Sequence, residues 1–257
     1  CFIAVQNSNN MIPILDFDGV VVDSVLDGFI ISYDTFLKEF KDAKKDFLVK
    51  DMHELQKTNP QQIEQFRKLR PFLKYGGDYI LMHYAIDKQL QITTMQQFTE
   101  LREQFKDKID KWSYEVHVSR DLIMKDDLEG WMHLSPPFKE IMQLMNTTKN
   151  KLYIASANEK KTIIEMLNFH NIKFPQENIF DCNFAKEKVK IMEHIKNLEQ
   201  CDFNNLLFID DQVEHLKNTK HLGIQVGLAT WGYCNEQQQE EANKNNIPLL
   251  DLQTINF

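Results

Sequence analysis

The sequence has few cysteines and glycines, no excess of positive charge and no long apolar run. Its 257 residues include 4 cysteines, 8 glycines and 7 prolines. Lysine and arginine total 30 against 38 aspartates and glutamates, which argues against nucleic-acid binding because that binding needs many cationic contacts to phosphates. No stretch approaches the roughly 20 apolar residues of a membrane helix. The apolar fraction of 42% is enough for a core, so a disordered or collagen-like chain is excluded.

The cysteines show neither the spacing of a zinc site nor that of a redox pair. They stand at positions 1, 182, 201 and 234, and no pair has the CxxC pattern. Free thiols are typical of a reducing compartment. Without a membrane span, this favours a cytoplasmic protein. Cys1 in place of methionine favours a processed or truncated N-terminus, with lipid modification as the less favoured alternative.

Apolar runs of strand length alternate with helical patterns toward both ends of the chain. The runs cover residues 11–17, 151–156, 205–210 and 223–229. Stretches with apolar residues at helical spacing, such as 161–170 and 189–195, stand between the later runs. Short runs that are apolar on both faces suit buried parallel strands. The pattern therefore predicts an α/β fold with a parallel sheet and right-handed crossovers.

The middle of the chain departs from this alternation and shows helical spacing throughout. Pro60, Pro71 and the pair Gly76–Gly77 stand at plausible helix boundaries. We therefore predict an all-helical module over residues 23–135, inserted after the first strand. Residues 1–22 and 136–257 would together form the α/β core domain.

Acidic and polar side chains stand where three of the predicted strands end. They are Asp16 and Asp18 after the first run, Ser156 and Asn158 after the second, and Asp210 and Asp211 after the third. Ligands of open parallel sheets bind at the carboxyl ends of the strands. Carboxylates gathered there repel one another unless a cation neutralises them. Oxygen ligands of this kind suit Mg²⁺, which takes its remaining oxygens from water and substrate phosphate.

The first two aspartates suggest a chemistry for this edge of the sheet. One carboxylate can attack phosphorus and form an aspartyl-phosphate, while the other delivers and later removes a proton. Ser156 and a lysine would then hold the phosphoryl oxygens. Each residue alone has an ordinary explanation as a turn, a helix cap or a solvated surface. Their joint placement at successive strand ends is what predicts a site.

Three segments resemble motifs of the haloacid dehalogenase superfamily in its phosphatase form. Residues 14–24 read ILDFDGVVVDS and resemble the first motif, 154–158 read IASAN and resemble the second, and 207–211 read LFIDD and resemble the two-acid fourth motif. The resemblance covers roughly residues 11–24 and 136–234 in the expected order. It implies a Rossmann-like core with a helical cap that closes over substrate. Asp18 separates the chain from the dehalogenases of the superfamily, which lack this second acid.

The resemblance also implies roles for individual residues. Asp16 would be the nucleophile and a Mg²⁺ ligand, and Asp18 the general acid and base with a backbone carbonyl on the metal. Asp211 would bind the metal directly and Asp210 mainly through water, while Ser156 and Asn158 would contact phosphate. For the lysine of the third motif, the helical phase of Ile191 and Met192 favours Lys188 over Lys186.

We therefore expect a Mg²⁺-dependent phosphatase that hydrolyses a small phosphorylated metabolite, with neither nucleic acid nor membrane as a partner. A sugar phosphomutase with the same site is the nearest alternative. A phospho-accepting signalling module fits poorly because such domains are about half this length. A binding protein that has lost catalysis remains open because a fold does not fix a function. The sequence leaves the substrate and the oligomeric state open.

Overall fold

The computed structural model describes residues 11–255, and these divide into two compact units. One unit comprises the chain up to Asp23 and from Pro136 onward, and the other runs from Ser24 to Ser135. Cys1 and the polar segment 6–10 lie outside the described residues. The other three cysteines, Cys182, Cys201 and Cys234, are free thiols. Within the described residues, no helix combines the length and the apolar character that crossing a bilayer requires.

The α/β unit is built on one parallel sheet of six strands in the order β3-β2-β1-β4-β5-β6. The predicted fold class is therefore confirmed. The strands are β1 (Ile12–Leu15), β2 (Tyr153–Ala155), β3 (Ile179–Phe180), β4 (Leu206–Asp210), β5 (Gln225–Ala229) and β6 (Leu249–Leu250). β3 and β6 were not predicted from the sequence, because two residues are too few to show a period.

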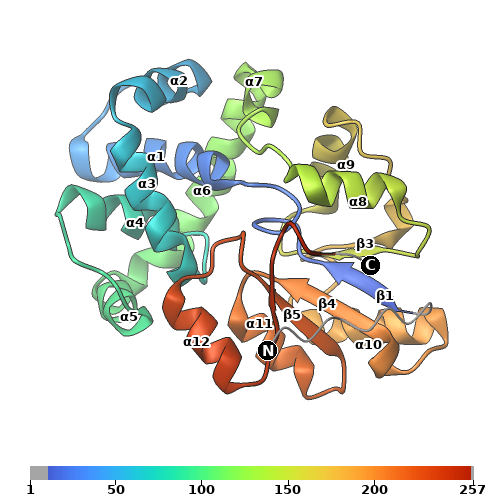
Figure 1. Cartoon of the computed structure of the whole chain (residues 1–257). Helices are drawn as coiled ribbons and strands as arrows, with labels where there is room; N and C mark the ends of the chain where they lie inside the picture. The colour runs from blue at the N-terminus through green and yellow to red at the C-terminus, as the bar shows by residue number, and fades with distance from the viewer. Residues whose placement is uncertain (1–10, 256–257) are drawn as a thin grey trace. The chain divides into compact units, whose positions relative to one another are not determined.

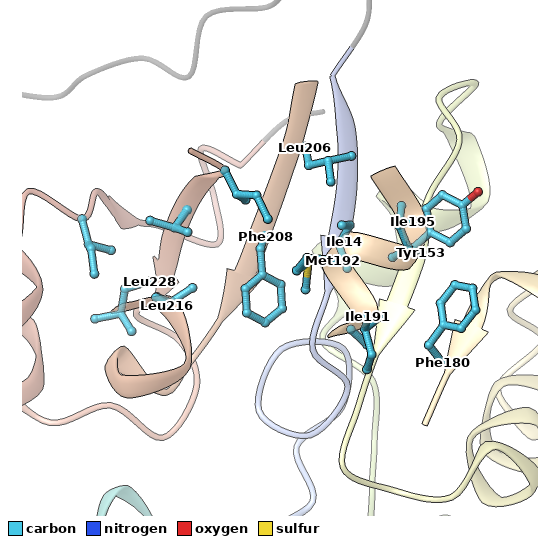
Figure 2. Close-up of a cluster of buried hydrophobic side chains, with 14 of the residues drawn as sticks. Ile14, Tyr153, Phe180, Ile191, Met192, Ile195, Leu206, Phe208, Leu216 and Leu228 are labelled. Atoms are coloured by element: carbon cyan, nitrogen blue, oxygen red, sulfur yellow. The ribbon is translucent and has the colours of Figure 1, made fainter. Parts of the chain in front are cut away.

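Helices cover both faces of this sheet, with α8 and α9 on one side and α10 and α11 on the other, as Figure 1 shows. The α-helices described in this unit are α8 (Lys139–Thr147), α9 (Lys160–Phe169), α10 (Lys188–Glu199), α11 (Val213–Lys220) and α12 (Glu236–Lys244). On the side of α10 and α11, Ile191, Met192 and Leu216 pack against Ile14 and Phe208 of the central strands, as Figure 2 shows. These side chains are at most 1% exposed. A sheet covered on both faces explains why its strands read as continuous apolar runs.

The unit from Ser24 to Ser135 is described throughout and contains helices and no strand. Its α-helices are α1 (Val25–Lys41), α2 (Val49–Thr58), α3 (Pro60–Leu69), α4 (Asp78–Asp87), α5 (Met95–Gln104), α6 (Ile109–Asp126) and α7 (Leu128–Met132), with two 3₁₀ turns at Arg70–Phe72 and Lys106–Lys108. The helical character predicted for this segment follows from apolar residues at spacings of three and four.

A buried histidine stands at the centre of this helical unit. His83 of α4 is 1% exposed, and its ring centroid lies 4.6 Å from those of Phe29 and Phe66 and 4.9 Å from that of Tyr33. Its Nε2 atom lies 2.9 Å from Ser32 Oγ. Burial lowers the pKa of His83 to about 3, since the charged ring would lose its hydration. His83 is therefore a neutral core residue at physiological pH.

We predict that His83 makes the protein less stable in acid. Below pH 6.5 the unfolded chain protonates this ring while the folded chain does not, so stability present at pH 7 is lost as the pH falls. Between pH 7 and pH 5 the loss should be about 2 kcal/mol. Urea denaturation at both pH values should show this loss in the free energy of unfolding of the wild type. His83→Phe, which has no ring to protonate, should not show it. The exposed His117 provides the control: in His117→Phe the free energy of unfolding should depend on pH as in the wild type. The same pH dependence in His83→Phe would contradict the prediction.

Candidate active site

The candidate site lies where the strand order of the sheet reverses. β1 pairs with β2 on one side and with β4 on the other. The amide of Asp16 donates to the carbonyl of Ile209 at 2.9 Å, and the amide of Ser156 donates to that of Phe180 at 3.0 Å. These bonds continue the parallel ladders one residue past β1 and β2. The ends of the strands therefore meet at one edge, where doubly wound folds bind their ligands.

A tight turn follows β1. The amides of Val21 and Val22 both donate to the carbonyl of Phe17, at 2.8 and 3.1 Å. Gly19 adopts a φ of +84°, which side-chain-bearing residues rarely adopt. A Cβ atom at this position would lie 2.5 Å from Oδ2 of Asp211. The turn therefore requires glycine both for its backbone and for the room that the Asp211 carboxylate occupies.

Lys188 connects the ends of β1 and β4. Its Nζ atom lies 2.8 Å from Oδ1 of Asp16 and 2.6 Å from Oδ2 of Asp210. The three side chains are at most 10% exposed. Lys188 is the first residue of α10, so the start of this helix sets where the ammonium lies. Lys186, the alternative lysine, lies two residues before the helix and is exposed.

Burial and charge act against each other in this cluster. Burial raises the pKa of the Asp16 carboxyl to about 6, although the Lys188 ammonium opposes the shift. Burial acts in the same direction on Asp210, but the charges of Lys188 and His215 outweigh it and hold the Asp210 pKa well below its ordinary value. Burial would release the proton of Lys188, yet both carboxylates raise its pKa above the usual value. The lysine is therefore charged, and Asp16 is the carboxylate that is easier to protonate.

Asp18 and the two polar residues after β2 form a second group of contacts. Asn158 Nδ2 donates to Oδ2 of Asp18 at 3.4 Å, and the Asn158 amide donates to Ser156 Oγ at 3.0 Å. Ser156 is buried, whereas Asp18 and Asn158 are half-buried. The structure thus brings Asp18, Ser156 and Asn158 together, and it joins Asp16, Lys188 and Asp210 separately through the ammonium.

Asp211 has surroundings different from those of Asp210. Its Oδ2 atom accepts the amide of Tyr233 at 2.8 Å. Gly232, like Gly19, approaches the Asp211 side chain so closely that a Cβ atom there would overlap it. The carboxylate therefore lies in a cradle between two glycines, next to the backbone that follows Asp18. Carboxylate and carbonyl oxygens such as those of Asp211 and of the nearby backbone are the ligands that a hard cation such as Mg²⁺ prefers.

A second acidic combination fits a metal less well. Asp16, Asp210 and His215 can place one ligand atom each within 4.8 Å of one another. The Lys188 ammonium, however, contacts both of these carboxylates. A metal ion at the same place would lie next to this positively charged ammonium and be repelled by it. The cation that neutralises this trio is therefore the lysine.

Two groups of the candidate site were not predicted from the sequence. The first is His215, whose Nδ1 atom lies 3.0 Å from Oδ2 of Asp210, and whose pKa the Asp210 charge raises. The second is the backbone amide of Tyr233 on Asp211. His215 follows Asp210 by five residues and lies in the first turn of α11, and this spacing could have indicated it. An amide from a distant loop leaves no mark in the sequence.

We predict that Gly19 is essential to the site for a steric reason. Gly19→Ala should lower the free energy of unfolding by about 3 kcal/mol, because it adds a clash with Asp211 to the cost of a positive φ. Gly223→Ala is the matched control, since Gly223 has a φ of +88° with nothing within 4 Å of its Cβ position. That control should cost only about 1 kcal/mol. Urea denaturation of both variants tests this, and equal losses would contradict it.

Comparison with known proteins supports the fold. No family model and no curated protein matches the sequence. Among solved structures, a haloacid dehalogenase-like hydrolase of Streptococcus pneumoniae aligns with a TM-score of 0.59 at 14% identity, over 96% of this chain and 97% of that one. A predicted phosphatase of Clostridium acetobutylicum aligns at 0.57 and 14%, over 95% of each chain. A subfamily IA hydrolase of Geobacter sulfurreducens aligns at 0.51 and 10%, over 88% and 90%. The chain has the haloacid dehalogenase-like fold.

Proposed function

We propose that the protein is a Mg²⁺-dependent phosphatase that hydrolyses a small phosphomonoester through a phosphorylated Asp16. The observation that carries the proposal is the pairing of Asp16 with the Lys188 ammonium at 2.8 Å, with a second acid two residues away. This combination provides a nucleophile, a proton donor and a fixed positive charge at one edge of the sheet. Among the structures of similar fold, the Clostridium acetobutylicum protein is described as a predicted phosphatase, which supports the same reaction class.

The first half of the reaction would phosphorylate Asp16. A carboxylate oxygen of Asp16 attacks phosphorus, and the bond from phosphorus to the ester oxygen breaks. Asp18, in its protonated form, donates its proton to the departing oxygen, so that an alcohol leaves. Lys188, Ser156 and the Asn158 side chain are suited to contact the phosphoryl oxygens, where the charge of the transition state lies.

The second half would release phosphate. Asp18, now a carboxylate, removes a proton from water, and the water oxygen attacks the phosphorus bound to Asp16. The bond between phosphorus and Asp16 breaks, which restores the carboxylate and yields inorganic phosphate. Asp18 ends the cycle with the proton it began with, so the balance needs no further reactant.

The metal would be held by the carboxylates of Asp16 and Asp211 and by the backbone carbonyl of Asp18. When bound, Mg²⁺ supplies positive charge that offsets the charge of Asp16 and of the phosphoryl group. We assign Asp210 to the lysine rather than to the metal, because its oxygens accept bonds from Lys188, His215 and the Gln212 amide.

We predict that Asp16→Asn and Asp18→Asn fail in different ways on an aryl phosphate with Mg²⁺. Asp16→Asn should lose activity entirely, because no nucleophile remains. Asp18→Asn should lose about 100- to 10,000-fold in turnover, the range of general acid–base catalysis. Because an aryl oxide leaves without a proton, this variant should still release one equivalent of phenol and retain a phosphoryl group on Asp16, visible by mass spectrometry. Asp251→Asn, at an exposed position, is the control. Full activity of Asp16→Asn would refute the proposal.

We also predict that the two candidate lysines differ sharply. Lys188→Met should abolish most of the activity and lower the free energy of unfolding by about 3 kcal/mol, because it leaves two buried carboxylates without their cation. Lys186→Met should change that free energy by no more than about 0.5 kcal/mol, as is usual at an exposed position. Steady-state kinetics and urea denaturation measure both effects. An equal response of the two variants would argue against the assignment of Lys188.

A further inference from the structure

His215 is a half-exposed residue that contacts a fully buried one. It lies in the first turn of α11, and its side chain is 43% exposed, whereas that of Asp210 is 0% exposed. The Nδ1 atom lies 3.0 Å from Asp210 Oδ2. Since a carboxylate can only accept, the ring donates from Nδ1, and this holds for a neutral ring as well as for a charged one. A side chain so exposed contributes little to the core, so its main described contact is polar.

The Asp210 carboxylate is fixed at both of its oxygens. Its Oδ1 atom accepts the amide of Gln212 at 2.8 Å. Its Oδ2 atom accepts both from His215 and from Lys188 Nζ, the latter at 2.6 Å. The amide and the ring together determine the rotation of the carboxylate group. Without the ring, the Gln212 amide would be the one described bond, apart from that of Lys188 itself, that holds the Asp210 carboxylate with Oδ2 facing the ammonium.

The oxygen that His215 and Lys188 share also affects how strongly Lys188 interacts with each of its two carboxylates. The ammonium lies between Asp210 and Asp16, at 2.6 and 2.8 Å. A carboxylate oxygen with a single donor binds an ammonium more strongly than one that serves two donors. The second bond from His215 therefore weakens the hold of Asp210 on Lys188. Lys188 is then available to Asp16 and to a group attached to it.

We propose that His215 is a positioning residue that orients Asp210 and, through it, sets Lys188 against Asp16. The proposal rests on the proposed phosphatase function for its effect on rate. His215 would act on the phosphoryl-transfer step and hardly on substrate binding, because it is linked to the reacting atoms only through Asp210 and Lys188. It therefore predicts a change in kcat with little change in KM.

Two substitutions separate positioning from packing. His215→Leu has a similar size and no donor, whereas the amide nitrogen of His215→Asn can take the place of Nδ1. On an aryl phosphate with Mg²⁺, we expect kcat to fall at least 10-fold in the leucine variant. This is the scale typical of losing a residue that orients a functional side chain by a hydrogen bond. KM should stay within about twofold, and the asparagine variant should recover most of kcat. His221→Leu, at an exposed histidine just past the end of α11, should behave as the wild type.

Crystal structures of the two His215 variants provide a readout independent of activity. The Lys188–Asp16 contact should lengthen beyond hydrogen-bond distance in His215→Leu and persist in His215→Asn. If the wild type hydrolyses no phosphate ester while the lysine shifts as expected, the proposed function fails and the positioning role stands. If kcat and the lysine position are both unchanged in His215→Leu, the positioning role is overturned. Equal losses of kcat in both variants, with lowered melting temperatures, would also overturn it in favour of packing.

Discussion

The ammonium of Lys188 is the contact on which the candidate site depends, because it neutralises two buried carboxylates at once. Carboxylates that share a buried site repel each other, and burial further disfavours their charged forms. Even with the lysine present, the pKa of Asp16 is raised to about 6. In the proposed reaction, Asp16 would have to be ionised to attack phosphorus. The interaction of the Lys188 ammonium with Asp16 therefore decides whether the proposed nucleophile is ionised. The other groups that contact the cluster act by changing this interaction.

The sheet brings these groups together with little help from local sequence. β1 stands between β2 and β4, so residues that follow three different strands meet although nearly 200 positions separate Asp16 from Asp210. Lys188 reaches the same edge because α10 begins there and leads into β4. Gly19 and Gly232 then make room for Asp211. The topology sets which residues meet, and the glycines set how closely they approach.

The strand ends were predictable because the four longer apolar runs are distinct, and parallel strands present their carboxyl ends at one edge. The preference for Lys188 came from helical phase, and the structure places its ammonium against Asp16. Other features were beyond a single sequence. β3 and β6 have two residues each and take their conformation from pairing with β2 and β5. The Tyr233 amide reaches Asp211 from a loop more than 20 residues away, and a backbone group has no residue type by which to recognise it.

In the proposed site, the adjacent acids Asp210 and Asp211 would each bind a different cation. Although they are neighbours in the chain, the two acids have different partners. Asp210 meets Lys188 and His215, whereas Asp211 meets the Tyr233 amide between two glycines. Asp210 is thus occupied by the fixed organic cation, which leaves Asp211 as the acid suited to the proposed metal. Asp16 would then be flanked by positive charge from two sources. The lysine is permanent and the metal exchangeable, so the metal would add a dependence on Mg²⁺ concentration to the dependence on pH that follows from the raised pKa of Asp16.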